Sequence, residues 1–232
     1  MNGVGTNNES NRVTWLQMSL AQVSAGSRIL DAGAGERKFM SFCEHLSYVA
    51  QDFAGYDGKG DYRGLQTGAR DLSQLDIVSD ITAIPEQDGS FDAIMCIEVF
   101  EHLPDPLAAI CEFARLLRPG GQLILTAPFC CLTHYAPYHF YTGFSRYFYE
   151  NHLPENGFHI NELVENGNYF EYLAQEVRRI PTVASRYANS RTTLLEALAT
   201  RLVLNMLKLF SARDNGSSDL LHFGCFVRAT KK

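Results

Sequence analysis

The chain has 232 residues, of which 46% are hydrophobic and 20% are charged, and its formal net charge is −6. This composition is typical of a globular protein with enough apolar material for a core, and the length most simply predicts a single domain. Phosphate binding needs clustered Lys and Arg, so we expect no nucleic-acid partner. The first ten residues, rich in Asn and Gly, predict a frayed tail.

The cysteine pattern gives information on metal binding and on the cellular compartment. None of the six cysteines forms a CxxC pair, so we expect no metal site. We find no signal peptide, and interpret the thiols as reduced in a cytoplasmic protein. The cysteines are Cys43, Cys96, Cys111, Cys130, Cys131 and Cys225.

The first elements are a helix and a strand with a glycine-rich turn. An apolar stripe that includes Trp15 predicts a helix over residues 11–25. Residues 28–36 then read as a short buried strand, an acid and a turn. Gly33 and Gly35 allow the backbone to turn tightly and to approach a ligand closely. Asp31 stands at the strand end, so we expect a nucleotide-type pocket at the carboxyl edge of a parallel sheet.

A second strand, residues 48–53, follows a helix that we expect to open near Arg37. It ends in Asp52, 21 residues after Asp31, which is about the spacing of a ribose-binding acid. Residues 54–75 predict a long loop with a helical turn near its end. Such a loop is either functional or a tolerated surface insertion.

Further strands alternate with helical segments. Residues 77–81 and 91–97 predict strands, and the second is apolar enough to be central. Pro106 suits the first turn of a helix that runs to about Leu117. A turn at residues 118–121 and a strand at 122–127 follow. This alternation predicts a parallel sheet with helices on both faces.

Four blocks in this order and spacing carry a family resemblance. They are Leu30–Gly35, Asp52, Asp80–Ile81 before a Pro and an Asp-Gly-Ser-Phe-Asp run, and Glu98–His102 followed by Leu116–Gly121. The chain resembles the class I S-adenosylmethionine-dependent methyltransferases of the bacterial small-molecule type. The resemblance is strong over residues 28–130 and loose elsewhere.

The resemblance implies S-adenosylmethionine as cofactor and a role for each motif residue. Asp31, Gly33 and Gly35 cradle its methionine end, and Glu98 contacts the methionine amine or the acceptor. Ribose binding falls to Asp52, next to Phe53, and adenine binding to Asp80 and Ile81. Glu36 and Phe39 stand where a dinucleotide fingerprint has further glycines, which disfavours the alternative of an NAD-dependent oxidoreductase.

The resemblance also implies the fold class: α/β, a Rossmann-like doubly wound seven-stranded sheet, mostly parallel, with strand seven antiparallel and helices on both faces. We expect one domain over residues 1–232, with a cofactor-binding core at 28–130 and an acceptor-side half at 131–232. That half should hold a helix at 144–153, strands at 158–164 and 220–230, and a helical insertion at about 168–215. The apolar stripe of 193–210 predicts a core or lid helix, or else a homodimer or membrane-surface face; it is too charged for a transmembrane segment.

The resemblance implies chemistry by direct displacement at the methyl carbon, so the protein supplies alignment and, for weak nucleophiles, a base. Residues 133–141 leave the fifth strand where the acceptor should lie and are rich in His and Tyr. We propose His139, His134 and His102 as base candidates, although each can equally be a hydrogen-bonding loop residue.

Three functions remain open. The first is O-methylation of a small molecule, such as a sugar or secondary metabolite. The second is methylation at nitrogen or carbon, or of a lipid-linked or protein acceptor. The third is a protein that binds S-adenosylmethionine without transferring the methyl group.

Overall fold

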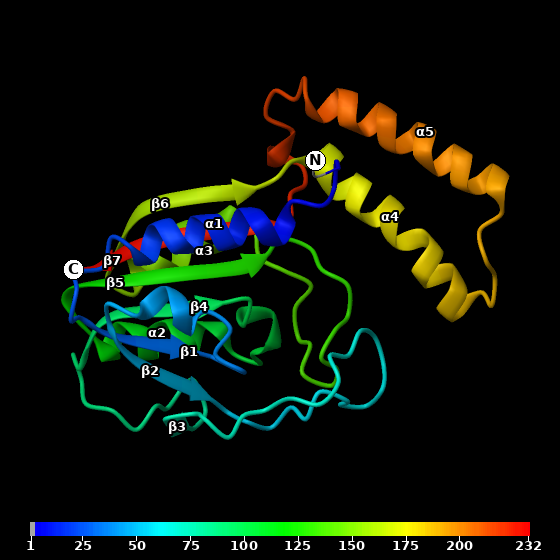
Figure 1. Cartoon of the computed structure of the whole chain (residues 1–232). Helices are drawn as coiled ribbons and strands as arrows, with labels where there is room; N and C mark the ends of the chain where they lie inside the picture. Colours follow the sequence, from blue (N-terminus) through cyan, green and yellow to red (C-terminus); the bar gives the residue numbers. More distant parts are fainter. Residues whose placement is uncertain (1–2) are drawn as a thin grey trace. The chain divides into compact units, whose positions relative to one another are not determined.

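A seven-stranded sheet organises the computed structural model, which describes residues 3–232 (Figure 1). The strand order is β3-β2-β1-β4-β5-β7-β6, with β1 to β5 paired in parallel and β7 antiparallel to β5. This confirms the α/β fold class, including an antiparallel strand seven between strands five and six. The strands are β1 Arg28–Ala32, β2 Ser47–Asp52, β3 Ile77–Val78, β4 Phe91–Ile97, β5 Leu117–Pro128, β6 Phe158–Asn166 and β7 Gly224–Lys231.

Side chains of the central strands alternate between two apolar clusters, one on each face of the sheet. In β4, Ile94 packs in the cluster that α2 and α3 complete, whereas Met95 packs in the cluster that α1 completes. Successive residues of a strand point to opposite faces, which explains why these strands are apolar throughout. The helices are α1 Asn8–Leu20, α2 Pro106–Leu116, α3 Arg146–Glu155, α4 Tyr169–Tyr187 and α5 Leu194–Ser211.

The chain divides into two compact units. One comprises residues 14–164 and 224–232 and holds most of the sheet; the other comprises residues 3–13 and 165–223 and holds α4 and α5. In the second unit Val4 is buried with Ala174 and Leu207, and the Gly5 N–H donates to Glu171. The expected frayed tail is therefore wrong for residues 3–10, because apolar contacts and backbone hydrogen bonds hold them; residues 1–2 lie outside the described residues.

Three expected elements differ in extent. The helix expected after Arg37 is only a 3-10 turn, Met40–Cys43, and Arg37 itself has a positive φ of 55°, which does not continue a helix. Residues 69–75 form no helix and hold only a turn at residues 73–74. The turn expected at residues 118–121 lies within β5, where the pairing with β4 shifts register.

Strand β3 is shorter than the expected 77–81 because the chain turns at Asp80. The Asp80 carboxylate accepts hydrogen bonds from the N–H and the hydroxyl of Thr82, which ends the extended segment. Strand β7 begins at Gly224 rather than Leu220, since a 3-10 turn at Ser217–Asp219 precedes it.

Helix α5 was expected to be a core or lid helix, and its stripe is largely exposed. Leu207 is its buried residue and packs with α4, whereas Leu195 is 76% exposed and Leu202 is 61% exposed. The expectation of a core helix is therefore wrong for most of this stripe. Within residues 3–232, no helix combines the length and apolarity needed to cross a bilayer.

Candidate functional site

A cavity of about 370 Å³ lies at the carboxyl ends of β1, β2 and β4. The turn after β1 contributes Gly33, the end of β2 contributes Asp52, and the residue after β4 is Glu98. This is the edge where ligands bind in parallel α/β sheets. Of the residues proposed for cofactor and base, the cavity is lined by Gly33, Asp52, Phe53, Asp80, Ile81, Glu98 and His102.

The turn after β1 needs its glycines. Gly33 has φ of +80°, and a Cβ there would lie 2.6 Å from Val99 Cγ2. Gly35 has φ of +52°, and a Cβ there would meet the Arg70 guanidinium. The Gly35 N–H donates to Asp52 Oδ2 at 3.0 Å, which ties the turn to the end of β2. The backbone therefore forms an open cradle that a side chain would fill.

The two acids proposed for ribose and adenine are held in fixed orientations. Asp52 is 6% exposed, and its Oδ1 accepts a hydrogen bond from the Ala54 N–H at 2.9 Å. Asp80 is fixed by its contacts with Thr82. A carboxylate has about four acceptor positions, so each acid keeps lone pairs for a ligand. Both side chains can therefore accept hydrogen bonds from a nucleoside in the cavity.

Asp31 lies deeper than the sequence suggested. It is 3% exposed, does not line the cavity, and accepts a 2.5 Å hydrogen bond from the Tyr48 hydroxyl. Burial raises the pKa of Asp31 to about 7; the Tyr48 hydrogen bond opposes this rise and the charge of Asp52 adds to it. Any action of Asp31 on a ligand in the cavity is therefore indirect.

Glu98 stands at the start of the loop after β4. Its φ is 56°, which is uncommon for a residue with a side chain, and its carboxylate accepts a 2.9 Å hydrogen bond from the Thr126 hydroxyl. Strand β5 thus fixes the direction of a negative charge that lines the cavity.

His102 is the one of the three base candidates that lines the cavity among the described residues. Its Nδ1 lies 2.5 Å from the Tyr138 carbonyl oxygen. A carbonyl only accepts, so Nδ1 carries the hydrogen and the lone pair of the neutral ring is on Nε2. Burial and the charge on His134 lower the pKa of His102 to about 3, which keeps the ring neutral at ordinary pH.

His134 and His139 lie beside His102 without lining the cavity. The ring centroid of His102 lies 4.6 Å from that of His134 and 6.2 Å from that of His139. The buried Glu101 carboxylate lies 3.6 Å from His102 Nε2 and 3.7 Å from His134 Nε2. Burial raises the pKa of Glu101. Burial alone would lower the pKa of His134, but the nearby Glu101 carboxylate and the hydrogen bond to the Leu132 carbonyl raise it.

Several cavity residues were not singled out from the sequence. Arg70 enters from the long loop after β2, and its guanidinium lies 5.6 Å from the ring centroid of Tyr56 and 5.8 Å from that of Tyr135. The two rings stack at 4.7 Å. Loop residues have no periodic pattern that would mark them, although the loop's length already suggested either a function or an insertion. Its contribution to the cavity favours the functional interpretation.

Comparisons with known proteins agree with this geometry. Residues 30–125 match the family described as "Methyltransferase domain". A ubiquinone biosynthesis O-methyltransferase of Xanthomonas oryzae pv. oryzae is 40% identical over 105 residues, which are 44% of this chain and 43% of that protein. The match therefore spans less than half the length of that relative.

Two solved structures share the fold. One is the Haemonchus contortus phosphoethanolamine N-methyltransferase 2 in complex with S-adenosyl-L-methionine, with a TM-score of 0.55 and 18% identity, covering 95% of this chain and 52% of that chain. The other is the [4+2]-cyclase SpnF, with a TM-score of 0.56 and 17% identity, covering 96% and 81%. At these identities the likeness concerns the fold alone.

The family match and the predicted cofactor residues fall in the same segment of the chain. The glycine turn after β1 and the acids at the ends of β2 and β3 fall within residues 30–125, the segment that the family covers. Residues 30–125 of this chain match a methyltransferase domain, and S-adenosylmethionine is the cofactor of that family.

Proposed function

We propose that the chain transfers a methyl group from S-adenosylmethionine to a hydroxyl of a small acceptor, such as a sugar or a secondary metabolite. One observation carries the proposal: a single cavity is lined both by the motif residues Gly33, Asp52 and Asp80 and by the neutral His102. Its volume of about 370 Å³ is within the range of small-molecule sites.

The cavity fits the cofactor in its shape and in its donor set. The open backbone at Gly33 and Gly35 accepts the methionine end, Asp52 accepts the ribose hydroxyls next to Phe53, and Asp80 with Ile81 holds the adenine. Arg70, the cation that lines the cavity among the described residues, is suited to the methionine carboxylate. Glu98 balances the positive charge of the methionine amine or of the sulfonium.

The acceptor side of the cavity is aromatic. Tyr135, Tyr138 and Phe140 line it from the segment that follows β5, and the Phe53 and Tyr138 rings lie 5.0 Å apart. Aromatic walls bind sugars and planar metabolites and exclude water. The relative from Xanthomonas is an O-methyltransferase by name, which supports oxygen as the atom that is methylated.

The bound cofactor would supply an activated methyl group, so the protein's residues mainly align the acceptor and remove a proton. His102 presents the lone pair of Nε2, and that nitrogen has no hydrogen-bond partner among the described residues. The Glu101 carboxylate, 3.6 Å from Nε2, stabilises the proton that His102 accepts from the acceptor hydroxyl. We therefore place the proposed base at His102, because His134 and His139 do not line the cavity.

The proposal is tested by a screen of metabolite extracts with S-adenosylmethionine that carries a labelled methyl group. We expect label in a small hydroxylated product, with transfer absent when the protein is omitted. Saturable cofactor binding without any labelled product would favour a non-catalytic binder, and label in an amine or carbon position would contradict O-methylation.

His102→Gln is the variant that isolates the proposed base. Removal of a general base typically lowers kcat by about 10²- to 10⁴-fold. The affinity for the cofactor should change little, because His102 is not among the residues proposed to bind S-adenosylmethionine. The measurement is kcat for the labelled product beside calorimetry with S-adenosylmethionine. His159→Gln, an exposed histidine in β6, is the matched control. Unchanged kcat in His102→Gln would remove the base assignment.

A second candidate function, methylation of a lipid-linked acceptor at a membrane surface, is favoured by α5. This helix exposes Leu198, Leu202 and Leu209 at 54%, 61% and 59% and carries Arg201 and Lys208. An exposed apolar stripe with basic residues is suited to an anionic lipid surface. The same stripe also suits a homodimer face.

Vesicle flotation distinguishes a lipid surface from a second copy of the chain as the partner of the α5 stripe. We expect the protein to float with anionic phospholipid vesicles and the double variant Leu198→Glu, Leu202→Glu to remain in the soluble fraction, because the substitutions place charge in the apolar stripe. Val78→Glu, at an equally exposed apolar position in β3, is the control. Absence of flotation together with a dimer mass by light scattering, lost in the double variant, would support a homodimer instead.

A further inference from the structure

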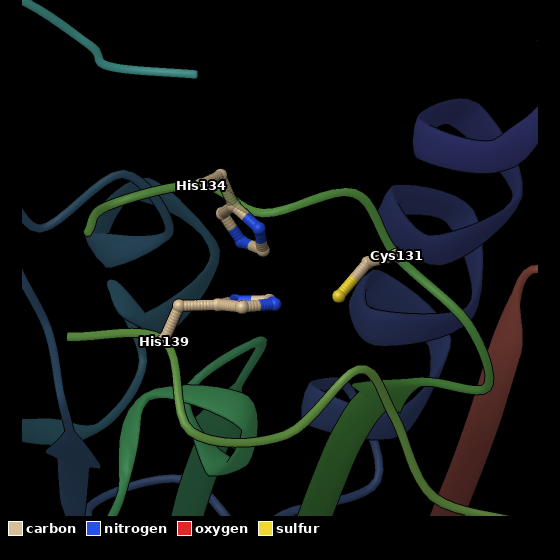
Figure 2. Close-up of side chains that lie close together, drawn as sticks. All are labelled: Cys131, His134 and His139. Carbon is tan, nitrogen blue, oxygen red and sulfur yellow. The ribbon is translucent and has the colours of Figure 1, made fainter. Parts of the chain in front are cut away.

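Three side chains of the loop after β5, those of Cys131, His134 and His139, lie close together, as Figure 2 shows. Their ligand atoms (one sulfur and two ring nitrogens) all lie within 4.8 Å of one another. Sulfur and imidazole nitrogen are the atoms that bind Zn²⁺, and a mixed C-x2-H-x4-H spacing contains no CxxC pair. The cysteine spacing rule that predicted no metal site therefore had no means of detecting this group.

The orientation of His134 is the one that a metal ligand needs. Its Nδ1 donates to the Leu132 carbonyl at 2.8 Å, so Nε2 is the nitrogen that releases its proton and offers a lone pair when a cation binds. Histidines that bind metals commonly donate their other N–H to a backbone carbonyl, which fixes the tautomer and the ring direction. The loop has therefore already selected the nitrogen of His134 that can bind a cation.

His139 has an unsatisfied ring. Both its nitrogens are buried, and neither has a hydrogen-bond partner among the residues that the structure describes. Buried polar atoms without partners cost free energy and call for an explanation such as an ion. A cation between His139 and Cys131 satisfies one of these nitrogens.

The loop backbone is held on both sides, which positions the three ligands. The Cys131 N–H donates to the Thr142 carbonyl at 2.7 Å, closing the base of the loop. On the other side, the Tyr135 N–H donates to Leu65 at 3.0 Å. Ligands on a pinned loop lose little conformational freedom when an ion binds, so the site is partly organised in advance.

The charges around the three ligands also favour a divalent cation. A Cys131 thiolate and the Glu101 carboxylate together carry two negative charges, and Glu101 Oε1 is 3.7 Å from His134 Nε2. Glu101 Oε2 is buried and has no hydrogen-bond partner among the described residues. This carboxylate can therefore neutralise the ion or complete a four-coordinate set.

We infer that Cys131, His134 and His139 form a binding site for a divalent cation of the Zn²⁺ type. Bond lengths of about 2.0 to 2.3 Å place the ligand atoms of a tetrahedral site about 3.5 Å apart, so only a small closure of the three side chains is needed. The ion would fix the loop that carries the cavity residues Tyr135 and Tyr138. Binding of the ion can be measured without methyl transfer and without knowledge of the acceptor.

Metal titration of the chelator-treated chain of 232 residues tests the site. With Co²⁺ as probe we expect one saturable equivalent and a thiolate-to-metal charge-transfer absorption; with Zn²⁺ we expect a single binding event by calorimetry. Cys131→Ser should remove the charge-transfer absorption. Cys131→Ser and His139→Asn should each weaken Zn²⁺ binding by roughly 100-fold or more, because loss of outer partners alone already costs about 10- to 100-fold.

The neighbouring residue Cys130, which is exposed and lies outside the cluster, provides a matched control as Cys130→Ser, and His159→Asn controls for histidine loss. Both controls should bind as the parent does. Thermal melts identify any variant that does not fold, and His139→Asn then replaces Cys131→Ser as the decisive variant. Absence of saturable binding, binding that persists in both ligand variants, or equal loss in the controls would each overturn the site. None of these readouts depends on the proposed methyl transfer.

Discussion

Asp52→Ala is expected to weaken the binding of S-adenosylmethionine by roughly 100-fold or more. Asp52 is nearly fully buried at the end of β2 and lines the cavity. Hydrogen bonds to a charged group contribute about 1.5 to 3 kcal/mol each, and a ribose offers two hydroxyls to one carboxylate. Calorimetry with S-adenosylmethionine measures the loss. S-adenosylhomocysteine, which lacks only the methyl group and the charge, should bind the parent comparably and lose affinity in parallel.

The control for Asp52 has to separate ligand binding from backbone support. Asp52 accepts hydrogen bonds from the N–H groups of Gly35 and Ala54, so Asp52→Asn, which keeps one acceptor oxygen, is the milder variant. Asp61 is exposed and likewise accepts from a backbone N–H, that of Arg63, which makes Asp61→Ala the matched control. An unchanged affinity for S-adenosylmethionine in a folded Asp52→Ala protein would contradict the assignment of Asp52 to the ribose.

Asp31→Asn is expected to stabilise the protein at pH 8 by up to about 4 kcal/mol, in the absence of cofactor. Burial raises the pKa of Asp31 from 3.8 to about 7, so at pH 8 the folded state carries a buried charge that costs free energy relative to the unfolded state. A tenfold change in proton affinity is worth about 1.4 kcal/mol. Asn keeps an acceptor for the Tyr48 hydroxyl and never ionises, so it removes the cost of the buried charge.

The sign of the pH dependence follows from the raised pKa. Below about pH 4 Asp31 is protonated in both states and ionisation costs nothing, and the cost grows between pH 4 and pH 7 as the unfolded state ionises. The advantage of Asp31→Asn should therefore be largest at pH 8 and small at pH 4. Urea unfolding at these two pH values measures it, with the exposed Asp61→Asn as control. An advantage that does not depend on pH would contradict the buried charge as its cause.

Much of the cofactor side of the site follows from local sequence. The order of strand, glycine turn and acid is encoded within short segments, as at residues 28–36, and strand period and turn chemistry act over a few residues. The strand β4 was predicted over the same residues that form it, Phe91–Ile97. The placement of Asp52, Asp80 and Glu98 at one edge then follows from parallel pairing.

Residues far apart in sequence decided the remaining features. Asp31 accepts a hydrogen bond from the Tyr48 hydroxyl of the neighbouring strand and does not line the cavity. Arg70 reaches the cavity from a loop without periodicity, and α5 leaves most of its leucines exposed although their stripe resembles that of a core helix. Burial of a side chain depends on what packs over it, which a helical pattern does not specify.

The sequence alone determined the α/β sheet, the glycine turn and the positions of the acids proposed for the S-adenosylmethionine pocket, because these depend on residue type and short spacing. The tertiary structure alone decided which of His102, His134 and His139 lines the cavity, and it brought Cys131 into the histidine cluster. That division has a physical reason. The loop after β5 is positioned by long-range backbone hydrogen bonds, from Phe140 to Glu101 and from Tyr135 to Leu65, which no local pattern encodes.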